Sequence, residues 1–268
     1  MRFSPLLILA LLTHALPAHA AFSVTLKDPK GDDDGPGSYT YPTDAVYTRG
    51  SFDLVEMSVK EAGPDIQIDL TFDASIEDPW GMAKQGGANF STQFVQVYVD
   101  TDHKPKSGET QAIAGMNATF ADESAFEKVI LISPQPAARV RSEVAQKSPK
   151  HKAMLVVPRS VSAKGKTITA LVSKKDLGEP KASWGWQALV SSNEGYPDAK
   201  DVLNRKVNEF EGPHRFGGGM DADDDPHFMD MLVSPAKGGD AEKDAQHKLL
   251  KPNKDKWAKP VLPMVYGG

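Results

Sequence analysis

Short apolar segments separated by turn-forming residues run through most of this chain and constrain its fold more than any other feature. Ile66, Ile68, Leu70 and Phe72 alternate with polar residues, a period of two that predicts a half-buried strand. Further strand-like runs lie at 94–99, 129–132, 154–157, 168–172 and 184–190. Segments rich in Pro, Gly, Asp and Ser separate the runs. Many short strands joined by turns predict an all-β fold, an antiparallel β-sandwich.

The pattern divides the chain into four segments. Residues 1–20 differ from the rest, 21–233 carry the sandwich, and 234–260 are rich in Lys, Asp, Gly and Pro. The third segment predicts a solvated, partly mobile connector. Residues 261–268 are apolar enough to return to the sandwich as a last strand. Helix is indicated only at 174–177 and 241–250.

The first segment has the pattern of a cleavable secretory signal peptide. Arg2 is followed by an apolar run at 6–12, and Ala18 and Ala20 supply the small residues that signal peptidase requires. The run is shorter than the about 20 apolar residues that span a bilayer, and no other stretch is apolar enough. A buried N-terminal helix is the alternative. We expect cleavage after Ala20 and a periplasmic or secreted protein without a membrane span.

Composition limits the classes of partner and the sources of stability. The chain has no cysteine, which excludes disulfides, thiolate chemistry and a lipid anchor on cysteine. A formal net charge of −5 argues against nucleic acid or an anionic membrane as the partner. An exported chain of this kind must depend on its core, and a bound metal is a further source of stability.

The acidic, Gly- and Pro-rich segment 28–44 is the most distinctive local feature. Its closely spaced carboxylates repel one another and need either a cation or full solvation. Calcium takes about six to eight oxygen ligands from such loops, although the spacing is not that of an EF-hand. Calcium binding and a solvated acidic turn are both compatible with the composition.

Other polar clusters carry weaker signals. Asp100 and Asp102 follow an apolar strand, where aspartates often cap turns, and four more aspartates lie within 221–225. Of the scattered histidines only His214 and His227, which flank a triglycine, merit inspection. No GxSxG, HExxH or phosphate loop is present. We find no credible catalytic set and predict that the protein is not an enzyme.

Aromatic side chains are the candidates for stacking on sugar rings. Trp184 and Trp186 share one face of a strand and are assigned to the core. Trp80 lies in a loop where an exposed ring is plausible, and Trp257 lies in the polar connector. The predicted ligand-binding residues are therefore Trp80, Tyr196 and Trp257.

Several blocks of this sequence together resemble the C-terminal domain of glucodextranase, which also occurs at the C-terminus of some amylopullulanases. The resemblance begins with the acidic segment 28–44 and covers nearly all of the chain after residue 20 in order. The other blocks are 50–54, 79–81, 93–103, 120–123, 132–134, 184–186, 215–219, 225–226, Asp230 and 262–265.

The resemblance implies a β-sandwich similar to DOMON-like domains and to family-nine carbohydrate-binding modules. It also implies an accessory module that binds polysaccharide or an envelope glycan, with structural calcium at the N-terminal loop. An envelope protein or a glycosidase is a further candidate partner. The metal ligands that we assign on this basis are Asp28, Asp32 and Asp44, with Asp53 and the carbonyl of Gly31 as additional candidates.

Two alternatives of a different class stay open. DOMON-like folds include haem-binding and redox domains, so a periplasmic haem-binding or electron-transfer module is the first. Its axial ligands would come from residues such as Met57, Met82, Met116 and Met154, although methionine more often fills gaps in a core. A structural subunit of an envelope complex is the second.

Overall fold

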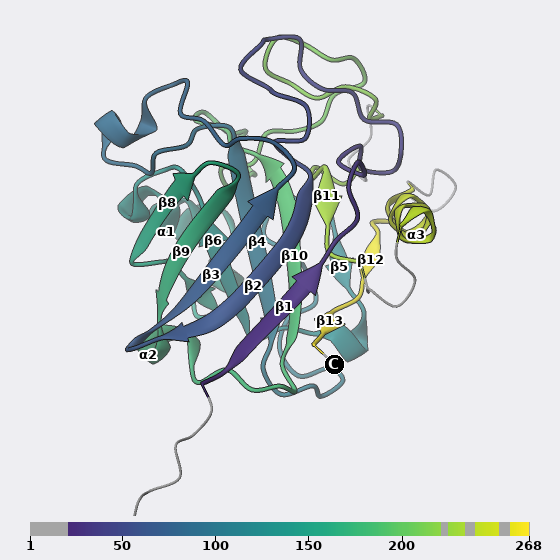
Figure 1. Cartoon of the computed structure of the whole chain (residues 1–268). Helices are drawn as coiled ribbons and strands as arrows, with labels where there is room; N and C mark the ends of the chain where they lie inside the picture. Colours follow the sequence, from purple (N-terminus) through teal and green to yellow (C-terminus); the bar gives the residue numbers. More distant parts are fainter. Residues whose placement is uncertain (1–20, 221–224, 234–238, 252–257, 268) are drawn as a thin grey trace, which may run out of the picture.

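Two β-sheets pack face to face in the computed structural model, which describes residues 21–220, 225–233, 239–251 and 258–267 (Figure 1). The first sheet has the order β1 (Ser23–Lys27), β2 (Leu54–Ala62), β3 (Asp65–Phe72), β9 (Thr167–Ser173), β8 (Ser160–Lys164). The second has the order β11 (Asp230–Met231), β10 (Gly185–Ser192), β4 (Gln93–Asp100), β6 (Lys128–Ile132), β7 (Leu155–Val156), with β13 (Val265–Tyr266) also on β10. All pairs in both sheets are antiparallel except β6–β7. The predicted all-β sandwich is confirmed.

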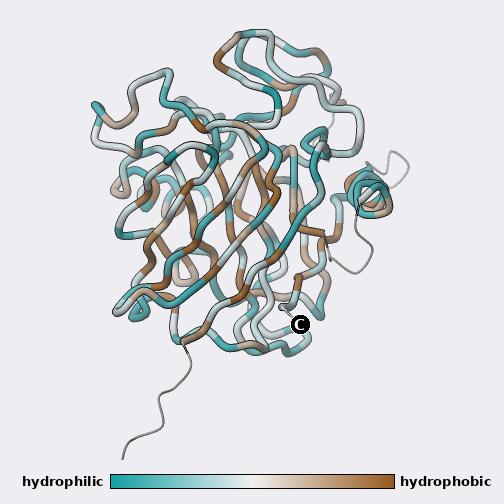
Figure 2. The backbone as a smooth tube through the Cα atoms, viewed as in Figure 1, coloured by the Kyte–Doolittle hydropathy of each residue, from teal (hydrophilic) through white to brown (hydrophobic). Residues whose placement is uncertain are grey.

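The main core lies between the two sheets, where apolar residues concentrate along the strands (Figure 2). From β3 it receives Ile66, Ile68, Leu70 and Phe72, so the predicted alternation is confirmed. The opposite sheet supplies residues of β4 and β10, among them Val95, Val97, Val99, Trp186 and Val190. Trp184 is buried here as well, and both tryptophans are core residues as expected.

The second sheet is buried on both of its faces, because a second core covers the side that points away from the first sheet. Phe94 and Tyr98 of β4 and Leu189 of β10 point into this outer core. Every residue of β4 and β10 is therefore buried, which explains the nearly continuous apolar run at 94–99. Two short parallel strands, β5 (Thr119–Phe120) and β12 (Val261–Leu262), contribute to the covering layer.

Helix α1 (Ala137–Lys147) is a second part of that layer and was not expected from the sequence. Only Val140 and Val144 of this helix are buried. Such a narrow apolar stripe gives a weak helical periodicity, and the remaining positions are polar or small. The single turn α2 (Lys174–Leu177) is at the predicted place, with the Ser173 hydroxyl accepting a hydrogen bond from the Lys175 amide.

The segment 234–260 is more than a solvated connector, which corrects the sequence interpretation. It contains helix α3 (Asp240–Leu250), at the place where helix was predicted. One face of this helix buries Glu242, Gln246 and Leu250 against the body of the protein. Beyond it, β12 and β13 bring the C-terminal segment back to the sandwich (Figure 1).

Candidate functional site

The long loop between β1 and β2, residues 28–53, lies at one end of the sandwich and is held there by tight turns. Gly31 has a φ of +80°, which an L side chain rarely adopts, and its amide donates a hydrogen bond of 2.6 Å to Oδ2 of Asp53. The Gly35 amide donates to the carbonyl oxygen of Met229, 2.8 Å away. A side chain at Gly35 would collide with the Tyr39 ring, so this turn requires glycine. The loop is thus anchored next to β11.

Three carboxylates from distant parts of the chain meet under this loop. Asp28 and Asp32 come from its first turn and Asp230 begins β11. One carboxylate oxygen from each lies within 4.8 Å of the other two, and all three residues are buried. We refer to Asp28, Asp32 and Asp230 as the carboxylate triad.

The hydrogen bonds of the triad leave several oxygens without a protein partner. Both oxygens of Asp230 accept backbone N–H groups, from Leu54 at 2.6 Å and from Met231 at 2.8 Å. Oδ1 of Asp28 accepts the Val233 amide at 3.3 Å. Among the residues that the structure describes, Oδ2 of Asp28, both oxygens of Asp32 and Oδ1 of Asp53 are buried with no hydrogen-bond donor. Buried anionic oxygens in this state are costly unless a cation binds them.

Burial and mutual repulsion change the acidity of these groups. Burial is the main cause that raises the pKa of Asp32 to about 8, and the charge of Asp53 adds to it. Burial likewise raises the pKa of Asp53 to about 7. The pKa values of Asp28 and Asp230 lie well above the usual range, first because of burial and then because of the neighbouring triad carboxylates. Without a cation, the triad therefore resists being fully ionised.

The arrangement could hold a hard divalent cation. All available donors are oxygens, which is the ligand type that calcium prefers, and a dipositive ion would neutralise the repulsion that raises the pKa values. The oxygens of Asp28 and Asp32 without a hydrogen-bond partner would be the ligand atoms, and Asp230 is held in place by its two backbone hydrogen bonds.

The sequence-predicted ligands divide into three groups. Asp28 and Asp32 belong to the triad. Asp53 lies beside the triad. Its carboxylate accepts a hydrogen bond from the amide of Gly31, and this bond joins Asp53 to the first turn of the loop. Asp44 is not in the triad, and its carboxylate instead accepts the Val46 amide at 3.0 Å and closes a turn.

Asp230 is the ligand candidate that sequence reasoning did not assign. Its position carries a signal, since an aspartate stands inside the apolar run 228–233 and both of its neighbours are methionines. A carboxylate in a short buried strand needs a hydrogen-bonding or oppositely charged partner. This requirement could have identified Asp230 as a candidate ligand.

A pocket of about 310 Å³ brings together two of the three predicted sugar-stacking residues. Trp80 and Tyr196 both line it, with Arg139, Glu194, Arg205 and His214 among the polar residues around them. Tyr196 is 93% exposed and is available as a stacking surface. Trp80 is half-buried and packs partly on the core. It therefore forms one edge of the pocket, and its ring is less exposed than that of Tyr196.

Hydrogen bonds and ion pairs hold the pocket wall in place. The Trp80 amide donates to the Ser91 hydroxyl, and the guanidinium carbon of Arg205 lies 5.5 Å from the Trp80 ring centre. Nε of Arg205 is 3.0 Å from Oε2 of Glu194, whose other oxygen accepts the Tyr196 amide. The pocket is consequently preformed, and a ligand would not have to order it.

The remaining predicted residues lie outside the carboxylate triad. Trp257 and residues 221–224 lie outside the described residues. His214 lines the Trp80 pocket, whereas His227 is buried elsewhere, near Asn117. Asp100 and Asp102 lie near Glu127, but the Asp100 carboxylate accepts the Asp102 and His103 amides and the Tyr266 hydroxyl.

The methionines considered for haem do not gather. Met57 lies in the main core, whereas Met116 is in the outer core with Met154 packed against it. Met82 lines the Trp80 pocket. Their positions are those of gap-filling core residues.

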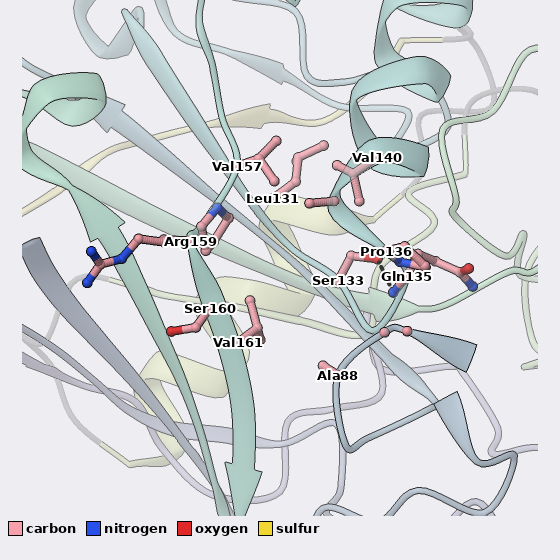
Figure 3. A pocket seen from close by; sticks show the side chains of 14 residues that line it. Ala88, Leu131, Ser133, Gln135, Pro136, Val140, Val157, Arg159, Ser160 and Val161 are labelled. Carbon is pink, nitrogen blue, oxygen red and sulfur yellow. Dashed lines mark hydrogen bonds between the residues drawn. The ribbon is translucent and has the colours of Figure 1, made fainter. Parts of the chain in front are cut away.

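A second hollow, of about 240 Å³, lies between α1 and β8 (Figure 3). Its wall contains Leu131, Val140 and Val157, and no aromatic ring lines it. The charged residue in its lining is Arg159, which points away from that apolar wall and pairs with Asp65. It offers less to a polar ligand than the Trp80 pocket does.

Fold and sites together define a β-sandwich binding module with a preformed aromatic pocket and a buried carboxylate triad. A family model described as the C-terminal, SLH-like binding module of glucodextranase matches residues 24–263. The match covers most of the chain, and the chain belongs to this family. A search of curated proteins finds no match.

Proposed function

We propose that this protein is a non-catalytic, carbohydrate-binding module and that the Trp80 pocket is its glycan site. The observation that carries the proposal is the meeting of Trp80 and Tyr196 in one pocket of a binding-module fold. An exposed phenol can stack on a pyranose ring, and the guanidinium and imidazole groups around it suit sugar hydroxyls. A polysaccharide or an envelope glycan is the partner class that this chemistry favours.

The acid in the pocket lining supports a binding role over hydrolysis. Glycosidases use a pair of carboxylates, one of which must exchange a proton with the sugar. Glu194 is the acidic residue among those that line the pocket, and it is engaged by Arg205 at 3.0 Å and by Arg215 at 3.6 Å. One carboxylate among the lining residues, already paired with two guanidinium groups, does not make the pair of carboxylates that glycoside hydrolysis uses.

Affinity gel electrophoresis on a panel of polysaccharides, followed by calorimetry on any that retard the protein, tests the glycan site. Tyr196→Ala should weaken binding by about fivefold or more, because truncating an aromatic anchor of a binding site costs about 1 kcal/mol or more. Phe210→Ala is the matched control, since Phe210 is 73% exposed but does not line the pocket. Equal loss in both variants, or no retardation on any glycan, would contradict the assignment.

For the carboxylate triad we propose structural calcium. The orphaned, buried oxygens of Asp28 and Asp32 support this, as does the absence of nitrogen and sulfur ligands from the triad. Bound calcium would neutralise the triad and stabilise the loop on β11; it has no proposed part in glycan chemistry. Isothermal titration of the chelator-treated protein with calcium measures the affinity directly, and Asp32→Asn should abolish the binding.

Export is the setting that we propose for this module. The proposal rests on the signal peptide predicted at 1–20, which lies outside the described residues. Calcium is abundant outside the cytoplasm, so export and a calcium-held loop are mutually consistent. Within the described part of the chain, no helix has the length and apolarity to cross a bilayer.

A further inference from the structure

Helix α3 packs against the loop that holds the carboxylate triad, although it lies near the other end of the chain. The side chains of Glu242, Lys243, Gln246 and His247 lie on one side of the helix, as their spacing along an α-helix requires. Each of these side chains lies close to the triad or to the segment 28–34. We call the four residues the docking face of α3.

Gln246 connects the helix to both parts of the metal site. Its side-chain nitrogen donates to the carbonyl oxygen of Asp32, and its side-chain oxygen accepts the Met231 amide at 3.1 Å. The residue is fully buried. A buried amide with both ends satisfied holds the helix in one register over the loop and β11. Nearby, Nε2 of His247 is 2.8 Å from Oδ1 of Asp34.

Two charged residues of the docking face, Glu242 and Lys243, differ in how deeply they are buried. Glu242 is only 3% exposed, so the docked helix adds a further buried acid to a region that already contains the triad. Burial is the main cause of the raised pKa of Asp28, and the charges of Asp32 and Glu242 both add to it. The ammonium of Lys243 approaches Gly31, but Lys243 is only partly buried and its charge is better screened by water.

We propose that helix α3 is a calcium-dependent latch, whose docking on the triad loop and the binding of the cation favour each other. The docked helix brings the Glu242 carboxylate next to the triad, which strengthens the field that attracts a cation. Without a cation, the same carboxylate repels Asp28 and opposes docking. By linkage, whatever docking contributes to calcium binding, calcium contributes equally to docking. The latch rests on the proposed calcium site.

The consequence of release would be local. The docked helix covers the triad, places Leu250 in the outer core and lets Gln246 bind Met231. Undocking would uncover these groups, while the two sheets keep their pairing and the main core stays intact. Calcium would then regulate the exposure of one apolar edge of the module as well as the shape of its loop.

Hydrogen exchange followed by mass spectrometry, with calcium and with excess chelator, tests the latch. We expect amides of 240–250 to exchange at least about tenfold more slowly with calcium, while those of β3 and β4 change little. Equal exchange of α3 in both conditions, in a protein that calorimetry shows to bind calcium, would overturn the latch and leave the metal site standing. No calcium binding by calorimetry would overturn both.

Variants at Glu242 and Lys243 separate the latch from a merely structural helix. Glu242→Gln should weaken calcium binding by about fivefold or more and yet slow the exchange of α3 in chelator, since it removes the repulsion. Lys243→Gln should tighten calcium binding. Asp244→Asn on the exposed side of the same helix is the matched control and should change neither quantity. If Glu242→Gln behaves like Asp244→Asn, or speeds exchange in both conditions, the proposal is wrong.

Discussion

Asp28 and Asp230 lie near opposite ends of the sequence, yet a carboxylate oxygen of one lies within 4.8 Å of a carboxylate oxygen of the other. The loop after β1 and the first residue of β11 are thereby joined at one end of the sandwich. Two buried like charges at this distance are unfavourable by themselves. A positively charged group bound between the two carboxylates would remove this repulsion.

Asp32→Asn should change the stability in opposite directions with and without calcium. With calcium at about 100 times its dissociation constant, the wild type gains about 2.7 kcal/mol of unfolding free energy that the variant loses. In chelator the variant should melt above the wild type, because the wild type must either bury the charge of Asp32 or take up a proton there on folding, and the amide does neither. Differential scanning calorimetry measures both. Asp44→Asn, at a turn outside the triad, serves as the control and should respond to calcium as the wild type does.

In chelator, the wild-type stability should fall as the pH rises. The pKa values of Asp53 and Asp32 are raised to about 7 and about 8, above the values of the unfolded chain. The folded state therefore binds more protons, so stability falls from about pH 4, near the pKa of the unfolded carboxyl groups, until the folded groups are ionised at about pH 8. Denaturant unfolding between about pH 5 and about pH 8 measures it. Saturating calcium should flatten or reverse the slope, and a slope that calcium leaves unchanged would count against the metal site.

His151 should make the protein sensitive to mild acid. Its ring is fully buried, with Nδ1 2.7 Å from the Ser148 hydroxyl and Nε2 2.7 Å from the Gln111 carbonyl oxygen. Burial lowers its pKa below 6.5, so the unfolded chain takes up a proton that the folded protein does not. Stability should fall as the pH drops below about 6.5. His151→Gln should reduce that slope in urea unfolding at a fixed calcium concentration, and an identical slope would refute the assignment.

Arg205→Met should destabilise the glycan pocket and the fold together. Arg205 and Glu194 are both about nine-tenths buried, and removing the guanidinium leaves Glu194 with the Tyr196 amide and the more distant guanidinium of Arg215. We expect a loss of about 3 kcal/mol, together with weaker glycan binding, because the Trp80 wall loses its support. Lys60→Met breaks the more exposed pair with Asp69 and should cost less than about 1 kcal/mol. Urea unfolding of the two variants measures the contrast.

The sandwich was predictable because the hydrophobic pattern of its central strands is clear in the sequence. The alternation at Ile66–Ile68–Leu70 and the apolar run that begins at Phe94 follow directly from burial on one face and on two faces, respectively. Helix α1 was not, since only Val140 and Val144 mark its inner side. A helix that covers a sheet with two side chains leaves almost no periodic trace.

The carboxylate triad was only partly predictable, and the reason is topological. Asp28 and Asp32 stand out in an acidic Gly/Pro-rich loop, whereas Asp230 joins them only because β11 pairs with β10 at that end of the sheet. Asp44 lies in the same acidic Gly/Pro-rich loop as Asp28 and Asp32, but its carboxylate accepts the nearby Val46 amide. Local sequence identifies candidate ligands, and long-range strand order selects among them.

Crystals of the protein grown with calcium and measured for anomalous scattering test the central claim most directly. The account predicts one strong calcium peak at the triad, about 2.3–2.6 Å from carboxylate oxygens of Asp28, Asp32 and Asp230, and none at Asp44. Without such a peak at the triad, and with the three carboxyl groups hydrogen-bonded to one another through retained protons, the calcium assignment would be contradicted.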